Sequence, residues 1–214
     1  MKKRILLVDD HPLIRKGIAL TLEEDLSFEV CSQLSDAEQA LSQINTINPD
    51  AAVVDVSLPG MNGIELVKHL RNMKPDLKIL IVSRHDEELY AERAIRAGAN
   101  GYIMKQEAGD VLVKGLHKIF NGGVYVSEAV SSRMLQNMMN NKKPIDSSPL
   151  EILSDRELEV FEHVGRGVTT KEIAERMHVS VKTIETYKAR IREKMGLESS
   201  HEITRLAIQW IGDL

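Results

Sequence analysis

The sequence of 214 residues contains a single cysteine, Cys31. One thiol can form neither a disulfide framework nor a thiolate metal cluster, so both are excluded as the means of stabilising this chain. We expect Cys31 to pack as a small hydrophobic side chain within a strand.

The chain also lacks a long apolar run. The N-terminus, MKKRILLVDD, is basic and then apolar, but the apolar part is too short for the hydrophobic region of a signal peptide. No other run approaches the length of a membrane span. We therefore expect a cytoplasmic protein with no membrane partner.

No charge of one sign dominates. The 28 Lys and Arg residues are balanced by 32 Asp and Glu residues, giving a net charge of -4. Composition therefore does not indicate nucleic-acid binding, and any such function must come from a local patch. The length allows one large domain or two small ones.

From residue 1 to about 124, apolar runs typical of strands alternate with segments of helical periodicity. Strands are predicted at 4–10, 28–32, 51–56, 78–83 and 101–105, and helices at 11–25, 35–48, 63–73, 86–99 and 110–122. Such alternation predicts the α/β class, with a parallel sheet covered on both faces. The five units fit a doubly wound sheet with strand order 2-1-3-4-5.

The pattern changes after the stretch NGGVYVS. Residues 125–140 predict a short helix, and the polar, proline-containing stretch that follows predicts a linker. Four further helices are predicted, at 155–165, 170–177, 181–195 and 200–211. We thus expect three parts: a first domain at 1–124, a helical segment and linker at 125–149, and a small all-α domain at 150–214.

Polar side chains follow the predicted strands of the first domain. Asp9 and Asp10 follow the first strand, Asp55 the third, Ser83 the fourth and Lys105 the fifth. This strand order brings them to one rim, at the switch point of the sheet. Three carboxylates repel one another unless a cation joins them, and hard oxygen ligands favour Mg²⁺. Together with an ammonium and a hydroxyl, such a site can neutralise a transferring phosphoryl group.

The blocks LLVDDHPLIRKGI, VVDVSLPGMNGIEL, ILIVS and AGANGYIMK resemble, in this order and spacing, the receiver domain of two-component response regulators. The resemblance covers residues 1–124 and implies phosphorelay signal transduction, in which Asp55 accepts a phosphoryl group from a sensor histidine kinase. It implies a phosphoacceptor rather than an enzyme with turnover, one that can catalyse its own phosphorylation and dephosphorylation.

The same resemblance assigns the residues of the site. It gives the magnesium ligands as Asp9, Asp10, Asp55 and the backbone carbonyl of Ser57. Ser83 and Lys105 would contact the phosphoryl oxygens. Tyr102 falls where the family carries an aromatic switch residue that acts with Ser83, although a tyrosine taken alone is more often a half-buried core aromatic.

Residues 169–197 carry a second signal. The helix at 170–177 is expected to bury Ile173, Ala174 and Met177. Ser180 follows a tight turn and can cap the next helix. That helix places four side chains on one face, Ile184, Tyr187, Ile191 and Met195. Two helices joined by so short a turn predict a helix-turn-helix, whose second helix enters the major groove of DNA.

Positive charge is concentrated on this second helix. Residues 150–214 contain ten Lys and Arg against twelve Asp and Glu, whereas 182–194 contain five against two, a net of +3. A basic helix can meet phosphates, but by itself it is more often a solvated face with internal ion pairs, such as Glu185 with Lys188.

Residues 153–197, which include DREL, KEIAERM and VKTIETYKARIREK, resemble the DNA-binding domain of regulators of the LuxR/NarL/FixJ type. The resemblance implies a recognition helix at about 181–195 and a last helix that pairs protomers on DNA. It therefore implies sequence-specific transcription regulation, with double-stranded promoter DNA and a homodimer as partners and RNA polymerase as a further candidate.

The DNA contacts are assigned on this recognition helix. Lys182, Thr183 and Lys188 are expected chiefly at phosphates. Glu185, Thr186 and Ala189 face outward toward base edges, where a glutamate can accept a hydrogen bond from a cytosine amino group. Arg190 and Arg192 are further candidates for DNA contact.

Two other classes of function remain open at this point. An aspartyl-phosphate enzyme would use the same carboxylates, but it needs an acid/base carboxylate two residues after the nucleophile, where this chain has Ser57. A pure interaction module would use the C-terminal helices for protein contact and would bind no DNA.

Overall fold

The computed structural model describes residues 1–139 and 149–212. They form two compact units, Met1–Met138 and Met139–Leu214. In the described residues no helix is both long and apolar enough to cross a membrane.

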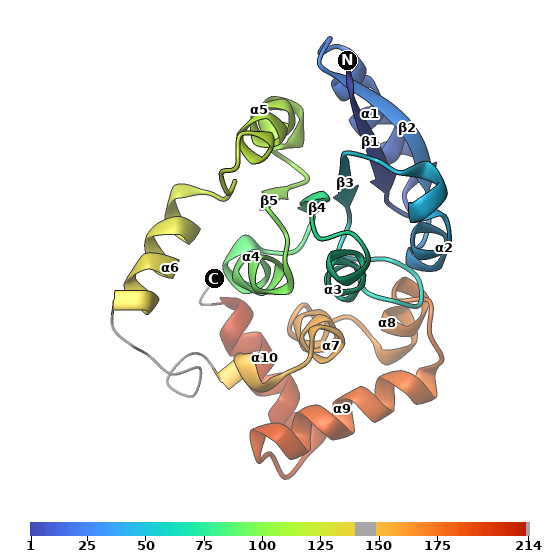
Figure 1. Ribbon diagram of the computed structural model, residues 1–214. Helices are drawn as coiled ribbons and strands as arrows, with labels where there is room; N and C mark the ends of the chain where they lie inside the picture. Colours follow the sequence, from blue (N-terminus) through green and yellow to red (C-terminus); the bar gives the residue numbers. More distant parts are fainter. Residues whose placement is uncertain (140–148, 213–214) are drawn as a thin grey trace. The chain divides into compact units, whose positions relative to one another are not determined.

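The first unit is built on five parallel strands (Figure 1). They are β1 (Lys3–Val8), β2 (Phe28–Leu34), β3 (Ala51–Val54), β4 (Lys78–Ser83) and β5 (Gly101–Met104). The strand order is β2-β1-β3-β4-β5, so the predicted doubly wound topology is confirmed. All four residues of β3 are buried, as expected for the central strand of a covered sheet.

Five helices cover the two faces of this sheet (Figure 1). They are α1 (Pro12–Glu23), α2 (Ala37–Ile47), α3 (Gly63–Met73), α4 (Glu87–Ala97) and α5 (Ala108–Phe120). Helices α1 and α5 share one face, where Ile18 and Leu22 of α1 and Leu112 and Leu116 of α5 join one buried cluster. Helices α2, α3 and α4 adjoin one another on the other face.

The strand bounds differ from the predicted ones in ways that matter for the site. Strand β2 continues to Leu34, which pairs with Val8. Strand β3 ends at Val54, so Asp55 is the first residue beyond it, although its backbone N–H still donates to the carbonyl of Val8 at 2.8 Å. Asp55 is therefore fixed to the end of β1 by the last hydrogen bond of the ladder.

Gly63, the first residue of α3, lets that helix start directly against Asp55. A Cβ atom at this position would lie 1.9 Å from the backbone oxygen of Asp55. The side chain of Asn62 caps the helix by accepting from the N–H of Ile64 at 2.7 Å. No side chain larger than hydrogen fits at Gly63 unless the backbone of the Asp55 loop moves.

The chain after α5 first runs along the sheet edge and then forms α6 (Glu128–Met139). Tyr125 makes a parallel bridge to Gly101 of β5. A helix was predicted from residue 125, but its first three positions are not helical because Tyr125 pairs with the strand edge. The predicted last helical residue, 140, lies outside the described residues.

The second unit is helical, as predicted. After a short 3₁₀ helix, Pro149–Ile152, at the end of the segment predicted as linker, come α7 (Asp155–Gly165), α8 (Thr170–Arg176), α9 (Val181–Met195) and α10 (Ser200–Gly212). Capping boxes start two of these helices, Ser154 with Glu157 on α7 and Thr169 with Glu172 on α8. Ser180 caps α9 by accepting from the N–H of Thr183 at 3.0 Å, which confirms the predicted start of that helix.

Candidate functional site

An acidic cluster lies at the carboxyl ends of β1 and β3. Asp9, Asp10, His11 and Asp55 each offer one ligand atom, and these atoms all lie within 4.8 Å of one another. Asp9 and Asp55 are 3% exposed. The structure thus brings together the three carboxylates that the sequence places at separate strand ends.

Lys105 places its ammonium between two of these carboxylates. Its Nζ atom lies 2.6 Å from Oδ2 of Asp55 and 2.6 Å from Oδ2 of Asp9, and its side chain is only 5% exposed. The backbone N–H of Lys105 donates to the carbonyl of Ser83 at 2.7 Å, which fixes the residue at the end of β5. A buried cation therefore offsets part of the negative charge at the rim.

Burial raises the pKa of Asp55 above its ordinary value. The Lys105 ammonium opposes this rise, and the Asp9 carboxylate reinforces it. The environment as a whole therefore disfavours the negative charge on Asp55. More positive charge at the rim would favour the ionised carboxylate, which is the nucleophilic form.

The donor set of the cluster fits a hard divalent cation. Three carboxylates in mutual reach suit Mg²⁺, which prefers oxygen ligands and is commonly held by one or two carboxylates together with waters. His11 is a member of the cluster that the sequence analysis missed. Its Nδ1 lies 2.5 Å from Oδ1 of Asp10, and its backbone N–H donates to Oδ1 of Asp9 at 2.8 Å. Its position in the sequence, directly after the two aspartates, was the one feature from which its membership of the cluster could have been predicted.

Ser83 and Tyr102 meet at His85, a second residue that the sequence analysis missed. Ser83 is fully buried, and its Oγ accepts from the backbone N–H of His85 at 3.2 Å. Tyr102 is 1% exposed and donates its hydroxyl to the carbonyl of His85 at 2.8 Å. The His85 ring in turn lies 2.8 Å, Nε2 to Oγ, from Ser57. His85 therefore joins the loop after Asp55, the end of β4 and the side chain of Tyr102.

Helix α9 of the second unit carries the predicted DNA-contact residues. Ile184 and Ile191 are buried on its inner face, and Tyr187 and Met195 are half-buried. The opposite face is exposed and contains Lys182, Glu185, Thr186, Ala189, Arg190 and Arg192. The predicted division of this helix into a packed and a free face is thus what the structure shows.

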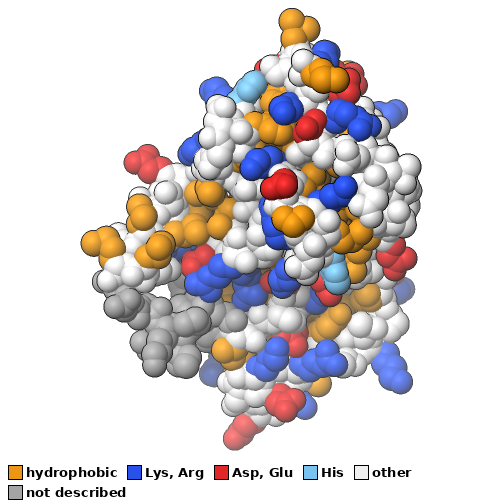
Figure 2. Space-filling model, viewed as in Figure 1, with side chains coloured by type: hydrophobic (Ala, Val, Ile, Leu, Met, Phe, Trp, Pro, Cys, Tyr) orange, Lys and Arg blue, Asp and Glu red, His pale blue; other side chains and the backbone are white. Residues whose placement is uncertain are grey.

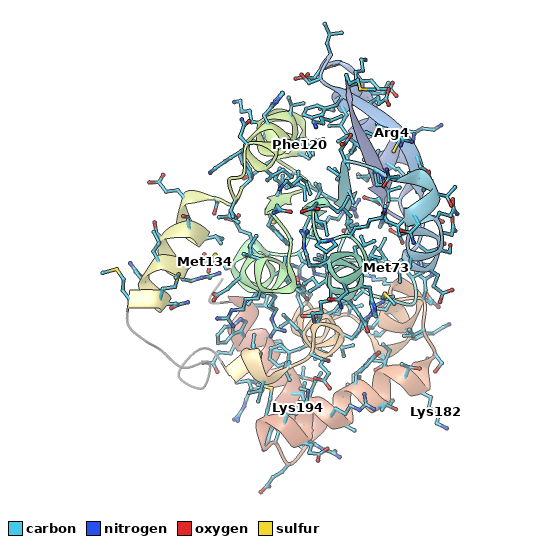
Figure 3. All side chains as sticks on the ribbon, in the orientation of Figure 1. Arg4, Met73, Phe120, Met134, Lys182 and Lys194 are labelled. Carbon is cyan, nitrogen blue, oxygen red and sulfur yellow. The ribbon has the colours of Figure 1, made fainter. Side chains whose placement is uncertain are left out.

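The cations on α9 are not equivalent. Lys194 lies 2.7 Å from Oε2 of Glu157 on α7, and that carboxylate also completes the capping box of α7. Lys188 is half-buried and donates to the hydroxyl of Thr170 on α8. Thr183, also half-buried, shares a hydrogen bond with Ser180 at 2.8 Å. Figure 3 labels Lys182 and Lys194 near the two ends of the helix.

Two family models match the chain. Residues 5–117 match the response regulator receiver domain. Residues 151–207 match the luxR family of bacterial regulatory proteins. The two matches fall in the two units described above, the first on the acidic cluster and the second on α9.

Individual proteins match over most of the chain. The oxygen regulatory protein NreC of Staphylococcus carnosus is 32% identical over 210 residues, which are 96% of this chain and 97% of that protein. A LuxR-family two-component response regulator from Aurantimonas has 32% identity and a TM-score of 0.60, covering 65% of this chain and 99% of its own. The response regulator RcsB of Salmonella typhimurium, in a structure described as showing conformational dynamism for DNA interaction, has 25% identity and a TM-score of 0.58, covering 96% and 97%.

Proposed function

This chain belongs to the response regulators that join a receiver domain to a LuxR-type DNA-binding domain, and we propose that phosphorylation of Asp55 controls its binding to promoter DNA. The observation that carries the proposal is the pair of contacts from Lys105 to Asp55 and Asp9 beside a cluster of three carboxylates. Such a site can accept a phosphoryl group and balance its charge.

The proposed reaction is attack by a carboxylate oxygen of Asp55 on the phosphorus of a phosphohistidine in a sensor histidine kinase. An O–P bond forms, the P–N bond breaks, and the imidazole leaves with its electron pair. We assign Lys105 and the hydroxyl of Ser83 to contacts with the phosphoryl oxygens. Slow hydrolysis of the acyl phosphate at the same site would return Asp55 to its carboxylate form.

We assign a Mg²⁺ site to the same rim. The groups proposed to hold the ion are the carboxylates of Asp9, Asp10 and Asp55, which lie within reach of one another, together with the backbone carbonyl of Ser57. When bound, the ion supplies positive charge next to the developing phosphoryl charge. Tyr102 and Ser83 are the proposed switch residues, because both are hydrogen-bonded to His85.

The proposed DNA contacts lie on α9. Lys182 and Thr183 are assigned to phosphates together with Lys188, whose ammonium must leave Thr170 to reach one. Glu185, Thr186 and Ala189 are assigned to base edges, and the further contacts are Arg190 and Arg192. A homodimer paired through α10 would read a two-fold symmetric site, and RNA polymerase is a further candidate partner.

We propose that the three parts of the chain have different functions. Residues 1–124 receive the phosphoryl group, 125–149 connect, and 150–214 bind DNA. The matched relatives support this division because their similarity extends over both parts.

The phosphorylation half is tested by incubating the full chain with acetyl phosphate and Mg²⁺ and measuring the intact mass. We expect the wild type to gain the mass of one phosphoryl group and Asp55→Asn to gain none. Asp110→Asn, an exposed aspartate on α5, is the matched control and should behave as the wild type does. Equal labelling of Asp55→Asn would contradict the assignment.

The DNA half is tested by selecting bound duplexes from a random pool, with and without acetyl phosphate. We expect a two-fold symmetric sequence to be enriched, and to be enriched more strongly with the donor. The donor should have no effect on Asp55→Asn. Recovery of random sequence at every salt concentration would reject sequence-specific binding.

A further inference from the structure

His11 lies between the acidic cluster and the first helix of the receiver unit. It is the residue that precedes α1, and its backbone carbonyl accepts from the N–H of Arg15 at 3.0 Å. A residue at this position commonly caps the helix with its side chain, but in the described chain the His11 side chain makes no such bond, and Pro12 follows as the first helical residue. The imidazole is therefore not used by the helix.

The imidazole instead faces two carboxylates. Its Nδ1 lies 2.5 Å from Oδ1 of Asp10 and 3.4 Å from Oδ1 of Asp9. In the part of the chain that the structure describes, this nitrogen is buried and makes no hydrogen bond. A nitrogen lone pair and carboxylate oxygens repel one another at such distances unless a proton or a metal ion lies between them. His11 thus offers the cluster either a proton donor or a metal ligand.

Lys105 and His11 contact different oxygens of the cluster. The Lys105 ammonium lies against Oδ2 of Asp9 and Oδ2 of Asp55. His11 faces Oδ1 of Asp9 and Oδ1 of Asp10. Its backbone N–H also donates to Oδ1 of Asp9 at 2.8 Å, which holds the residue on this side. The cluster therefore has an ammonium side and an imidazole side.

The imidazole side has the donor set of a borderline metal ion. Mg²⁺ favours oxygen ligands, whereas an imidazole nitrogen favours first-row transition ions such as Zn²⁺. Zn²⁺ is commonly held by four ligands at about 2.0–2.2 Å, so that neighbouring ligand atoms lie about 3.4 Å apart. The 3.4 Å from Nδ1 of His11 to Oδ1 of Asp9 has this value, and all four ligand atoms of the cluster lie within 4.8 Å of one another. Rotation of the Asp10 side chain would lengthen its shorter distance to His11.

The grouping of these side chains is particular to the rim, and solvent reaches it. In the described residues this is the one group of three or more side chains that could hold a metal ion. On the face drawn in Figure 2, by contrast, Asp and Glu side chains are scattered among Lys and Arg. The side chain of His11 is 42% exposed and that of Asp9 is 5% exposed, so an ion can approach from the imidazole side.

We propose that His11 is a further protein ligand at the rim and makes it a site for a divalent ion that favours imidazole, with Zn²⁺ as the probe of this class. The inference rests on the proposed function, because it uses the carboxylates assigned to Mg²⁺. Zn²⁺ and Mg²⁺ would therefore compete for Asp9, Asp10 and Asp55. The ion that occupies the rim would then depend on the supply of both.

Calorimetric titration of the full chain with Zn²⁺ and, separately, with Mg²⁺ tests the proposal. We expect His11→Ala to lower the ratio of Zn²⁺ affinity to Mg²⁺ affinity by about tenfold or more, since loss of a side chain that merely supports a metal ligand already costs about 10–100-fold. A change that only loosened the loop would weaken both ions together and leave the ratio unchanged. His69→Ala, at an exposed position on α3, is the matched control and should keep the wild-type ratio.

Imidazole ¹H–¹⁵N spectra locate the bound ion. The signal of His11, identified by its loss in His11→Ala, should shift at the first equivalent of Zn²⁺, before the other histidine signals. Excess Mg²⁺ should weaken the apparent affinity for Zn²⁺, because both ions use the same carboxylates. An affinity for Zn²⁺ that Mg²⁺ does not change would place Zn²⁺ elsewhere on the chain and overturn the proposal.

Intact mass separates failure of this proposal from failure of the proposed function. An unchanged affinity ratio in His11→Ala, when acetyl phosphate and Mg²⁺ add the phosphoryl mass to Asp55 of the wild type, would reject His11 as a ligand and leave it as a hydrogen-bond partner of Asp10. Absence of that mass in the wild type would reject the proposed function instead.

Discussion

The Nζ atom of Lys105 lies 2.6 Å from Oδ2 of Asp55, a residue 50 positions earlier in the chain. The same ammonium is shared with Asp9, and all three side chains are almost fully buried. The rim therefore contains one cation placed between two carboxylates. Removing the cation leaves two negative charges that face each other away from water.

Lys105→Met should destabilise the receiver unit by about 3 kcal/mol at neutral pH, because a broken buried pair leaves uncompensated charge. The measurement is urea unfolding followed by amide signals of the β strands. Asp55→Asn added to Lys105→Met should recover part of the loss, since it removes one of the two facing charges. Lys182→Met, at an exposed position on α9, should cost close to nothing. An Asp55→Asn change that deepens the loss would contradict this account of the rim.

Asp55→Asn alone should stabilise the receiver unit in a pH-dependent way. Burial raises the pKa of Asp55, so the folded protein binds the proton more tightly than the unfolded chain does. The ionised carboxylate thus lowers the free energy of unfolding as pH rises from the ordinary value of 3.8 toward the raised pKa. The advantage of the asparagine variant should grow over that range and then stay constant. Urea midpoints at a series of pH values measure this difference in stability between the variant and the wild type. If the advantage of the variant shrank as pH rose, folding would lower the pKa of Asp55 rather than raise it.

The rim could be predicted from the sequence because it depends on regular features. Buried strands end at polar residues, and a parallel doubly wound sheet brings those ends to one edge, so Asp9, Asp55 and Lys105 were placed correctly at one rim. The roles of His85 and Tyr125 could not be predicted. The contact from Ser57 to His85 spans 28 positions and depends on the conformations of two loops, for which periodicity gives no signal.

The charged residues of α9 show a similar limit to what can be predicted from sequence. The sequence gives the number of cations on the helix, but not which of them are already bound within the domain. Lys188 and Lys194 have partners on α8 and α7, whereas the side chains of Lys182 and Arg190 are exposed. Tyr125 was assigned to a helix because nothing local marks the pairing of a strand edge with Gly101.

His117→Ala should raise the pKa of Asp25. Nε2 of His117 lies 3.0 Å from Oδ2 of Asp25, and the N–H of Ser27 donates to Oδ1 at 2.7 Å. These bonds, with His117 the larger cause, lower the pKa of Asp25 from 3.8 to about 2. The stability they contribute is complete above pH 3.8 and is lost as pH falls through about 2. Carboxyl ¹³C titration should show the variant's Asp25 closer to 3.8, with His69→Ala unchanged; a value still near 2 would assign the shift to Ser27.

Salt dependence of DNA binding should separate the cations of α9 by function. A cation that neutralises a DNA phosphate releases counterions, so Lys182→Ala and Arg190→Ala should each reduce the slope of log Kd against log salt by about 0.9. Lys194 instead neutralises Glu157, whose carboxylate is buried and also caps α7.

Lys194→Ala should therefore leave the slope unchanged and lower the stability of the C-terminal unit by about 1 kcal/mol, less than a fully buried hydrogen bond to a charged group because the Lys194 side chain is partly exposed. Fluorescence anisotropy at several salt concentrations gives the slope, and thermal unfolding followed by the emission of Trp210 gives the stability. If Lys194→Ala reduced the slope as Lys182→Ala does, its ammonium would leave Glu157 for a phosphate in the complex. The DNA-binding face of α9 would then extend to its last turn.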